Sequence, residues 1–105
     1  MMKKRLLFLC SMGQNRSRTA AEMYKEQYET RYGGIVFRES LYTRKELLLD
    51  AEWADYIVIM RDYMQESVPS EFWMKIKKLN IMDVYGYNSN QLKAKIITEM
   101  HKIGL

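Results

Sequence analysis

The sequence predicts an α/β fold, a small doubly wound parallel sheet of four strands with helices on both faces. Two short, almost wholly apolar runs, 5–9 (RLLFL) and 56–60 (YIVIM), are typical of strands buried on both faces of a sheet. Helix-like segments alternate with strand candidates along the chain. Since crossovers between parallel strands are right-handed, this alternation predicts a sheet whose ligands bind outside the carboxyl ends of its strands.

The first half of the chain is expected to hold one helix and a short second strand. Good helix formers run from 16 to 32, Thr19 and Glu22 fit the capping box T-x-x-E, and Gly33-Gly34 is expected to end the helix. A strand is expected at 35–38. The side chains along the inner face of this helix are predicted to be Ala20, Met23, Tyr24, Gln27 and Tyr28.

The second half continues the alternation after the buried strand at 56–60. We expect a helix at 44–53, short helical pieces at 62–73 broken by Pro69, a weaker strand at 77–82 and a final helix at 90–103. The inward-facing residues of the two full helices are predicted to be Leu47, Leu48 and Ala51 in the first, and Leu92, Ile96, Ile97 and Met100 in the second.

Length and cysteine content indicate one soluble domain, 1–105, in a reducing compartment. A chain of 105 residues can bury roughly two thirds of its unfolded surface without disulfides. Its one cysteine cannot form an intramolecular disulfide or a cysteine-rich zinc site. The run LLFLC is too short for the core of a signal peptide, and no apolar run is long enough to span a membrane. We therefore expect a cytoplasmic protein, monomeric and without membrane attachment.

The net charge of +4 is unevenly distributed, with basic ends and an acidic middle. No basic stripe with interleaved aromatic residues and no nucleic-acid-binding motif accompanies the positive charge, so a small anionic group is favoured over nucleic acid. His101 is the single histidine and has no clustered carboxylates beside it in sequence, which argues against a metal site.

The segment between the first strand and the first helix carries the strongest chemical signal. Five residues separate Cys10 from Arg16, enough for the backbone to close around a tetrahedral anion with its N–H groups inward and a helix N-terminus beneath. Such surroundings favour the nucleophilic thiolate of Cys10, and Arg16 can hold two phosphoryl oxygens at once. The residues expected to bind phosphate are Ser11, Met12, Gly13, Gln14, Asn15, Arg16 and Ser17, with the Ser17 hydroxyl donating to the Cys10 sulfur or capping the helix.

Alternative interpretations exist for both reactive residues. Cys10 could be a buried structural thiol at the end of a strand. Arg16 could be a solvated residue of the first helical turn, although helix N-termini disfavour a cation unless an anion is present.

The pattern C-x5-R-S directly after the first strand resembles that of the low-molecular-weight protein tyrosine phosphatases, in a short variety. Residues 54–60 resemble the third strand of that family, and 82–86 (MDVYG) resemble its general-acid loop, commonly P-D-P-Y-G. The resemblance implies that Asp83 is the general acid. Both prolines of the acid loop are absent, with Met82 and Val84 in their places, and Gly13 stands where the family usually has Asn.

Some residues around this site keep two interpretations. Tyr85, by the resemblance, and Tyr42 and Tyr87 are candidates for the walls of a substrate cleft, but each could equally be half-buried packing. Asp83 could be a turn or capping residue, in which case Asp62, just after the third strand, is the substitute acid.

The resemblance implies a cysteine-dependent phosphomonoester hydrolase that acts through a phosphocysteine on phosphotyrosine in a protein or on a small aryl phosphate. No metal or other cofactor is expected, because Arg16 and the backbone amides supply the positive charge. A phosphoryl carrier resembling the IIB components of the bacterial phosphotransferase system is the main alternative, but those loops lack the arginine. Arsenate reductase on the same fold usually needs further cysteines, and a catalytically silent phosphate- or phosphopeptide-binding module stays open.

Overall fold

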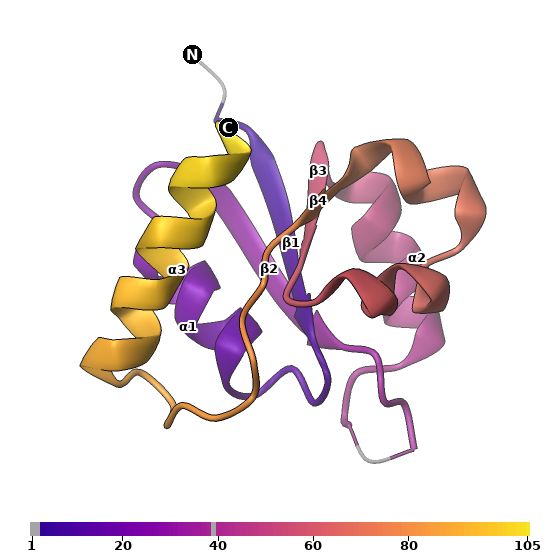
Figure 1. Ribbon diagram of the computed structural model, residues 1–105. Coiled ribbons are helices and arrows are strands. Elements are labelled where there is room, and N and C mark those ends of the chain that lie inside the picture. Colours follow the sequence, from indigo (N-terminus) through magenta and orange to yellow (C-terminus); the bar gives the residue numbers. More distant parts are fainter. Residues whose placement is uncertain (1–2, 39) are drawn as a thin grey trace.

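The computed structural model describes residues 3–38 and 40–105 and contains one parallel sheet, with strand order β2-β1-β3-β4 (Figure 1). Helical segments join successive strands, as parallel pairing requires. Their bounds are Arg5–Cys10 for β1, Glu29–Gly34 for β2, Tyr56–Ile59 for β3 and Ile76–Lys78 for β4.

Helices cover both faces of the sheet, as the sequence predicts. Figure 1 shows α1 and α3 on one face and α2 with two short 3-10 helices on the other. In the described part of the chain, no helix is both long and apolar enough to cross a membrane. The bounds are Arg16–Tyr24 for α1, Arg44–Trp53 for α2 and Asn90–Ile103 for α3, with the 3-10 helices at Asp62–Ser67 and Ser70–Lys75.

The two central strands form the middle of the core. Residues 6–9 of β1 and 57–59 of β3 are fully buried and pair in register, with Phe8 opposite Val58. Burial on both faces explains why these strands read as continuous apolar runs. The carboxyl end of β1 opens into the loop 11–15, at the opposite end of the sheet from the C-terminus of the chain (Figure 1).

The predicted first helix is too long, and the second strand is misplaced. Helix α1 ends at Tyr24, and 29–34 forms the edge strand β2 instead of continuing the helix, while 35–38 is not a strand. The fully buried β1 needs a hydrogen-bonding partner on each side, and the chain leaving α1 supplies the second one. Because β2 is an edge strand with mostly exposed side chains, its sequence carries little apolar signal.

The predicted capping box at Thr19 and Glu22 is also wrong. Thr19 lies inside α1, fully buried, and its side chain accepts a hydrogen bond from the N–H of Asn88 at 3.1 Å. A capping box does exist one helix later, where Thr43 and Glu46 bond reciprocally and start α2.

The helices 44–53 and 90–103 and the two helical pieces on either side of Pro69 are confirmed. Two predicted inward residues of these helices are exposed instead, Leu48 at 45% and Ile97 at 55%, because each lies one position beyond the buried stripe of its helix. Gln27, predicted to face inward from the first helix, is exposed as well, since it lies beyond the end of α1. The predicted strand at 77–82 is shorter than expected. The chain leaves the sheet after β4, and the N–H of Asn80 donates to the Glu99 carboxylate of α3.

Candidate active site

The loop after β1 turns its carbonyl groups outward. The carbonyls of Cys10, Ser11 and Met12 accept hydrogen bonds of 2.9–3.0 Å from the N–H of Ile35, the N–H of Val36 and the hydroxyl of Ser40. In a trans peptide the N–H points away from the carbonyl of the same unit, so the following N–H groups face the opposite side. Gly13 shows this directly, since its N–H donates to the Cys10 sulfur at 3.3 Å.

Glycines allow this loop to lie directly against β2. Gly13 has a φ of +73°, in the left-handed region that glycine adopts without strain. A Cβ on Gly34 would lie 2.4 Å from the carbonyl carbon of Met12 and 2.7 Å from the nitrogen of Gly13. On Gly33, a Cβ would lie 2.4 Å from the Tyr42 ring. The pair Gly33-Gly34, predicted to end a helix, is therefore where the loop and the edge strand make close backbone contact.

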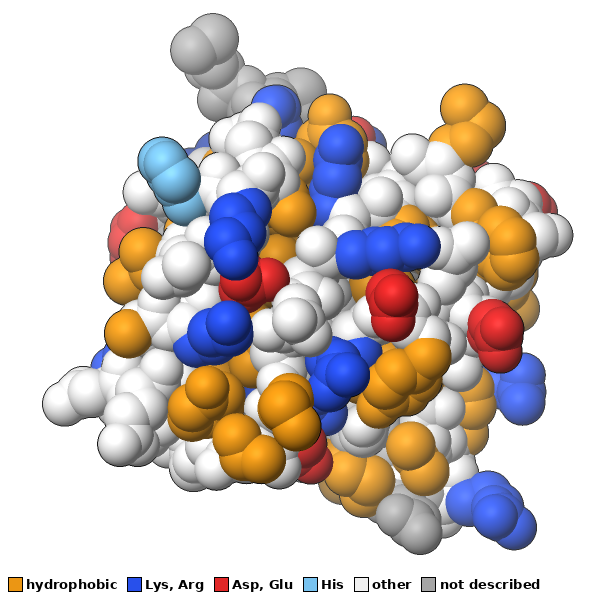
Figure 2. Space-filling view, viewed as in Figure 1, with side chains coloured by type: hydrophobic (Ala, Val, Ile, Leu, Met, Phe, Trp, Pro, Cys, Tyr) orange, Lys and Arg blue, Asp and Glu red, His pale blue; other side chains and the backbone are white. Residues whose placement is uncertain are grey.

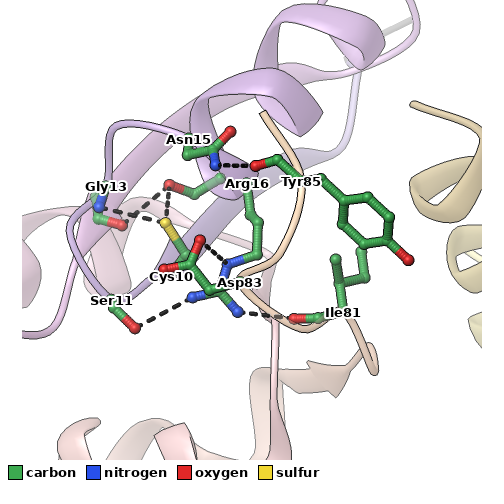
Figure 3. Close-up of polar contacts among 10 residues, drawn as sticks. Cys10, Ser11, Gly13, Asn15, Arg16, Ile81, Asp83 and Tyr85 are labelled. Atoms are coloured by element: carbon green, nitrogen blue, oxygen red, sulfur yellow. Dashed lines mark hydrogen bonds and ion pairs between the residues drawn. The ribbon is translucent and has the colours of Figure 1, made fainter. Parts of the chain in front are cut away.

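The sulfur of Cys10 has a hydroxyl partner. Cys10 is 2% exposed, and its Sγ lies 3.0 Å from Oγ of the fully buried Ser17. The same hydroxyl lies 3.3 Å from the carbonyl oxygen of Gly33. A hydroxyl has one proton, so it can donate to the sulfur when the sulfur is a thiolate, or to Gly33 when the thiol itself is the donor. Ser17 can thus contact Cys10 as either a thiol or a thiolate. Figure 3 shows the contact of the Cys10 sulfur with Gly13.

Arg16, the first residue of α1, is 2% exposed, so it is not a solvated first-turn arginine. Its Nη1 donates to the carbonyl of Ile81 at 2.7 Å, and its Nη2 donates to Oγ of Ser11 at 3.1 Å (Figure 3). Within the described structure, its buried Nε has no hydrogen-bond partner. The edge formed by Nε and Nη2 is the one that grips carboxylate or phosphate oxygens in pairs. One side of the guanidinium is therefore anchored, and the other is set to receive an anion.

The segment 82–86, predicted to be the acid loop, brings Asp83 to this cation. Asp83 Oδ1 lies 3.8 Å from Arg16 Nε, and the Asp83 side chain is 60% exposed, so solvent and a bound molecule can both reach it. Asp62 begins the 3-10 helix after β3 and borders a surface hollow together with Lys78 and Asn80. Of the two candidate acids, the structure brings Asp83 beside Arg16.

Tyr42 lies against β2, behind the loop. Its hydroxyl donates to Asp50 at 2.6 Å, and it borders a hollow of about 440 Å³ that Met12, Gly13 and Gln14 also line. Burial, reinforced by the hydrogen bond to Asp50, raises the pKa of Tyr42 well above its ordinary range. The phenol therefore stays neutral and serves as a hydrogen-bond donor at neutral pH.

Tyr85, in the predicted acid loop, and Tyr87, just after it, have separate surroundings. Tyr85 is half-buried and packs against the core, and its carbonyl accepts a hydrogen bond of 2.7 Å from Nδ2 of Asn15. The hydroxyl of Tyr87 donates to Glu22 of α1, which raises the pKa of this phenol, and the Arg18 guanidinium lies 4.8 Å from the centre of its ring. Tyr87 thus packs along α1.

Three contributors to the site are not evident from the sequence. The carbonyl of Ile81 anchors Arg16, the amide of Asn15 reaches the acid loop, and the carboxylate of Glu99 fixes the N–H of Asn80 just before that loop. A main-chain carbonyl has no sequence signal. Glu99 could have been noticed as an acidic residue on the apolar face of a helix, one position before the buried Met100.

No protein-family model matches the sequence, and a comparison with curated proteins finds no match. Solved structures do match over nearly the whole chain. Wzb of Vibrio vulnificus, determined in complex with benzylphosphonate, is 13% identical with a TM-score of 0.65, covering 96% of this chain and 94% of that one. The YwlE arginine phosphatase of Geobacillus stearothermophilus is 19% identical with a TM-score of 0.65, covering 95% and 88%.

A third match is the low-molecular-weight protein tyrosine phosphatase of T. tengcongensis, 17% identical with a TM-score of 0.61 over 96% of this chain and 95% of that one. The three matches cover nearly the whole of this chain, and so include its sheet of order β2-β1-β3-β4 and the loop after β1. The chain therefore has the α/β fold of the low-molecular-weight protein tyrosine phosphatases.

Proposed function

We propose that this protein, as a single domain spanning 1–105, is a cysteine-dependent phosphomonoester hydrolase of the protein tyrosine phosphatase type. One observation carries the proposal: the Nε of the buried Arg16, which makes no hydrogen bond in the described structure, lies 3.8 Å from the exposed carboxylate of Asp83, and Arg16 directly follows the loop that begins at Cys10. A nucleophile, an anion-binding edge and a candidate acid are thus gathered at the carboxyl end of β1 (Figure 3).

In the first step, the Cys10 thiolate attacks phosphorus in line with the departing oxygen. The S–P bond forms as the P–O ester bond breaks, and Asp83 transfers its proton to the oxygen that leaves. The N–H groups of loop 11–15 and the start of α1 hold the phosphoryl oxygens. The products of this step are a phosphocysteine, a neutral phenol and the Asp83 carboxylate.

In the second step, the Asp83 carboxylate takes a proton from water as the water oxygen attacks phosphorus. The S–P bond breaks, inorganic phosphate leaves, and Cys10 returns to the thiolate, which the Ser17 hydroxyl can stabilise from 3.0 Å. The exposure of Asp83 supports this role, because the attacking water must reach it from solvent.

Arg16 is proposed to act in both transition states. Its Nε and Nη2 form a planar edge that matches two equatorial oxygens when phosphorus is trigonal bipyramidal. Because Nη1 stays on the carbonyl of Ile81, the guanidinium is held in position before substrate binds. We propose that no metal or other cofactor takes part, since the guanidinium and the backbone amides provide the positive charge.

The proposed substrate is phosphotyrosine in a protein, or a small aryl phosphate. The exposed apolar side chains of Met82 and Val84 flank Asp83 and can contact an aromatic ring. Figure 2 shows hydrophobic side chains gathered at the lower end of the molecule, where β1 ends in Figure 1. We further propose a monomer in the cytoplasm, with no nucleic-acid or membrane partner, because a reactive thiol is kept reduced there.

A phosphoryl carrier is the alternative that must be separated from a hydrolase. A carrier protects its phosphocysteine from water, whereas the exposed Asp83 beside Arg16 favours its hydrolysis. A silent phosphate-binding module would bind orthovanadate but release no phenol.

The test is turnover of an aryl phosphate, followed by quench-flow with a labelled phosphate donor. We expect phenol release that Cys10→Ser abolishes and that chelators leave unchanged, with a short-lived phosphocysteine. Near-wild-type activity in Cys10→Ser would refute the nucleophile. A phosphoenzyme that persists for minutes without releasing phosphate would refute the hydrolase. Parallel assays with phosphotyrosine and phosphoarginine peptides test the proposed substrate, and a preference for phosphoarginine would overturn it.

A further inference from the structure

The acid loop is held at its two ends and is free in its middle. After β4, the buried Ile81 donates its N–H to the carbonyl of Met60 at 2.9 Å and accepts from Arg16 at its own carbonyl. Four residues later, the carbonyl of Tyr85 accepts from Asn15. Between these two points, residues 82–84 are exposed, and in the described structure their polar contact is the ion pair of Asp83 with Arg16. Residues 81–85 thus form an arch with Asp83 at its centre.

Two neighbouring residues at the start of α1 hold the two ends of this arch. Arg16 holds the carbonyl of Ile81 at 2.7 Å, and Asn15 holds the carbonyl of Tyr85 at 2.7 Å (Figure 3). Arg16 is committed to the phosphoryl group, so replacing it cannot isolate the effect of loop position. Asn15 can isolate it, because its side chain makes one polar contact in the described structure, and that contact is to Tyr85.

The orientation of the Asn15 amide supports a role for this contact. A carbonyl can only accept, so Tyr85 requires the NH₂ end of the amide, which leaves Oδ1 buried without a partner. An unsatisfied buried acceptor costs stability. What the amide contributes at this position is therefore its hydrogen bond to the carbonyl of Tyr85.

We propose that Asn15 is a positioning residue: together with Arg16 it fixes the arch 81–85, so that Asp83 meets the leaving oxygen. The hydrogen bond supplies restraint that two prolines give in the loop pattern P-D-P-Y-G and that Met82 and Val84 cannot give. This inference rests on the proposed function, because it concerns the step in which Asp83 donates its proton.

The experiment compares Asn15→Ala, Asp83→Asn and the double variant on aryl phosphates with leaving groups of graded basicity. A misplaced acid should cost Asn15→Ala about 10- to 100-fold in kcat/KM on phenyl phosphate, less than the ~10²–10⁴-fold expected for complete loss of the acid, and much less on a nitro-activated ester. The quantity compared is kcat/KM, because it reports the step in which the leaving group departs. In the double variant, Asn15→Ala should add nothing to Asp83→Asn, because the acid it positions is already absent. Orthovanadate affinity should fall much less than kcat/KM on phenyl phosphate, since alanine keeps the backbone N–H at position 15 and both Cys10 and Arg16 are intact.

The matched control is Thr30→Val on β2, which removes another side-chain bond to a backbone carbonyl, the one from Thr30 to Ala21 at 2.9 Å. It should lower stability without changing the dependence on the leaving group. If Asn15→Ala does not fold, Asn15→Ser, whose side chain is too short to reach Tyr85, replaces it in the same cycle.

A loss in Asn15→Ala that is equal on all leaving groups, or that multiplies with Asp83→Asn, would overturn the inference while the proposed function stood. Wild-type behaviour of the variant would overturn it as well. A different result would refute the proposed function itself: the wild-type protein would turn over none of the esters.

Discussion

Gly34→Ala should damage the phosphate loop through a single added methyl group. The backbone of Gly34 is not in the left-handed region, so alanine is allowed there and the effect comes from space alone. The new Cβ would lie 2.4 Å from the carbonyl carbon of Met12, whereas ordinary contact begins at 3.4 Å. The obstacle is backbone of the loop itself. The loop must therefore move by about 1 Å, and a misplacement of that size can cost ~10²-fold in rate.

The variant should also have a lower free energy of unfolding. Overpacking destabilises the folded state by about 1–3 kcal/mol, whereas the lower entropy of the unfolded chain stabilises the protein by only about 0.4–1 kcal/mol. The measurements are kcat/KM on an aryl phosphate, orthovanadate affinity and unfolding in urea. Gly104→Ala is the matched control, because Gly104 caps α3 with a φ of +63° and has open space around it. This variant should lower the stability of the protein without moving the loop after β1. Wild-type kcat/KM in Gly34→Ala would refute the close packing of loop and strand.

Three further predictions concern charges. Arg16→Lys should lose ~10²–10³-fold in kcat, because a point charge cannot replace the Nε–Nη2 edge, and orthovanadate affinity should fall with it. Where phosphorylation of Cys10 limits the rate, which burst kinetics checks, Asp83→Asn should lose ~10²–10⁴-fold in rate on phenyl phosphate and less on nitro-activated esters, whereas Asp62→Asn should leave both rates unchanged. The reverse result would make Asp62 the acid. Burial raises the pKa of Glu99, but hydrogen bonds from Lys102 and the N–H of Asn80 outweigh it and hold that pKa below its usual range. Glu99 therefore stabilises the fold above about pH 4, and this contribution is lost as the pH falls through the folded-state pKa. In Glu99→Gln, the free energy of unfolding in urea should fall less steeply than in the wild type as the pH is lowered. An unchanged dependence on pH would contradict the prediction.

The elements predictable from the sequence are those whose own side chains carry the signal. Strands β1 and β3 are buried on both faces and so are apolar at almost every position. Helix α3 shows a helical stripe of buried residues, Leu92, Ile96 and Met100. The spacing of Cys10 and Arg16 between a strand and a helix likewise places both at the same end of the sheet, because a loop of five residues cannot separate them far.

Strand β2 could not be predicted in the same way, because its formation depends on its neighbour. Its side chains are mostly exposed, and its pairing with β1 is made by backbone groups that every residue has. In the sequence, the pair Gly33-Gly34 is compatible with two structures, the end of a helix or a close approach of two backbone segments. The fold decides between them, because the loop at Met12 packs against Gly34.

Arg16 shows why the placement of residues 82–86 depends on the fold, and why the site favours a transition state. Its Nη1 is fixed on the carbonyl of Ile81, whereas its Nη2 bonds the hydroxyl of Ser11, a neutral acceptor that a phosphoryl oxygen can displace. Binding an anion therefore exchanges one bond to a neutral group for two charge-assisted bonds, the second made by the previously unpartnered Nε. Both bonds reach their best geometry when the oxygens become equatorial, so most of the gain falls in the transition state. Because Ile81 belongs to the arch that carries Asp83, the contact that holds the guanidinium in place also brings the acid loop to it.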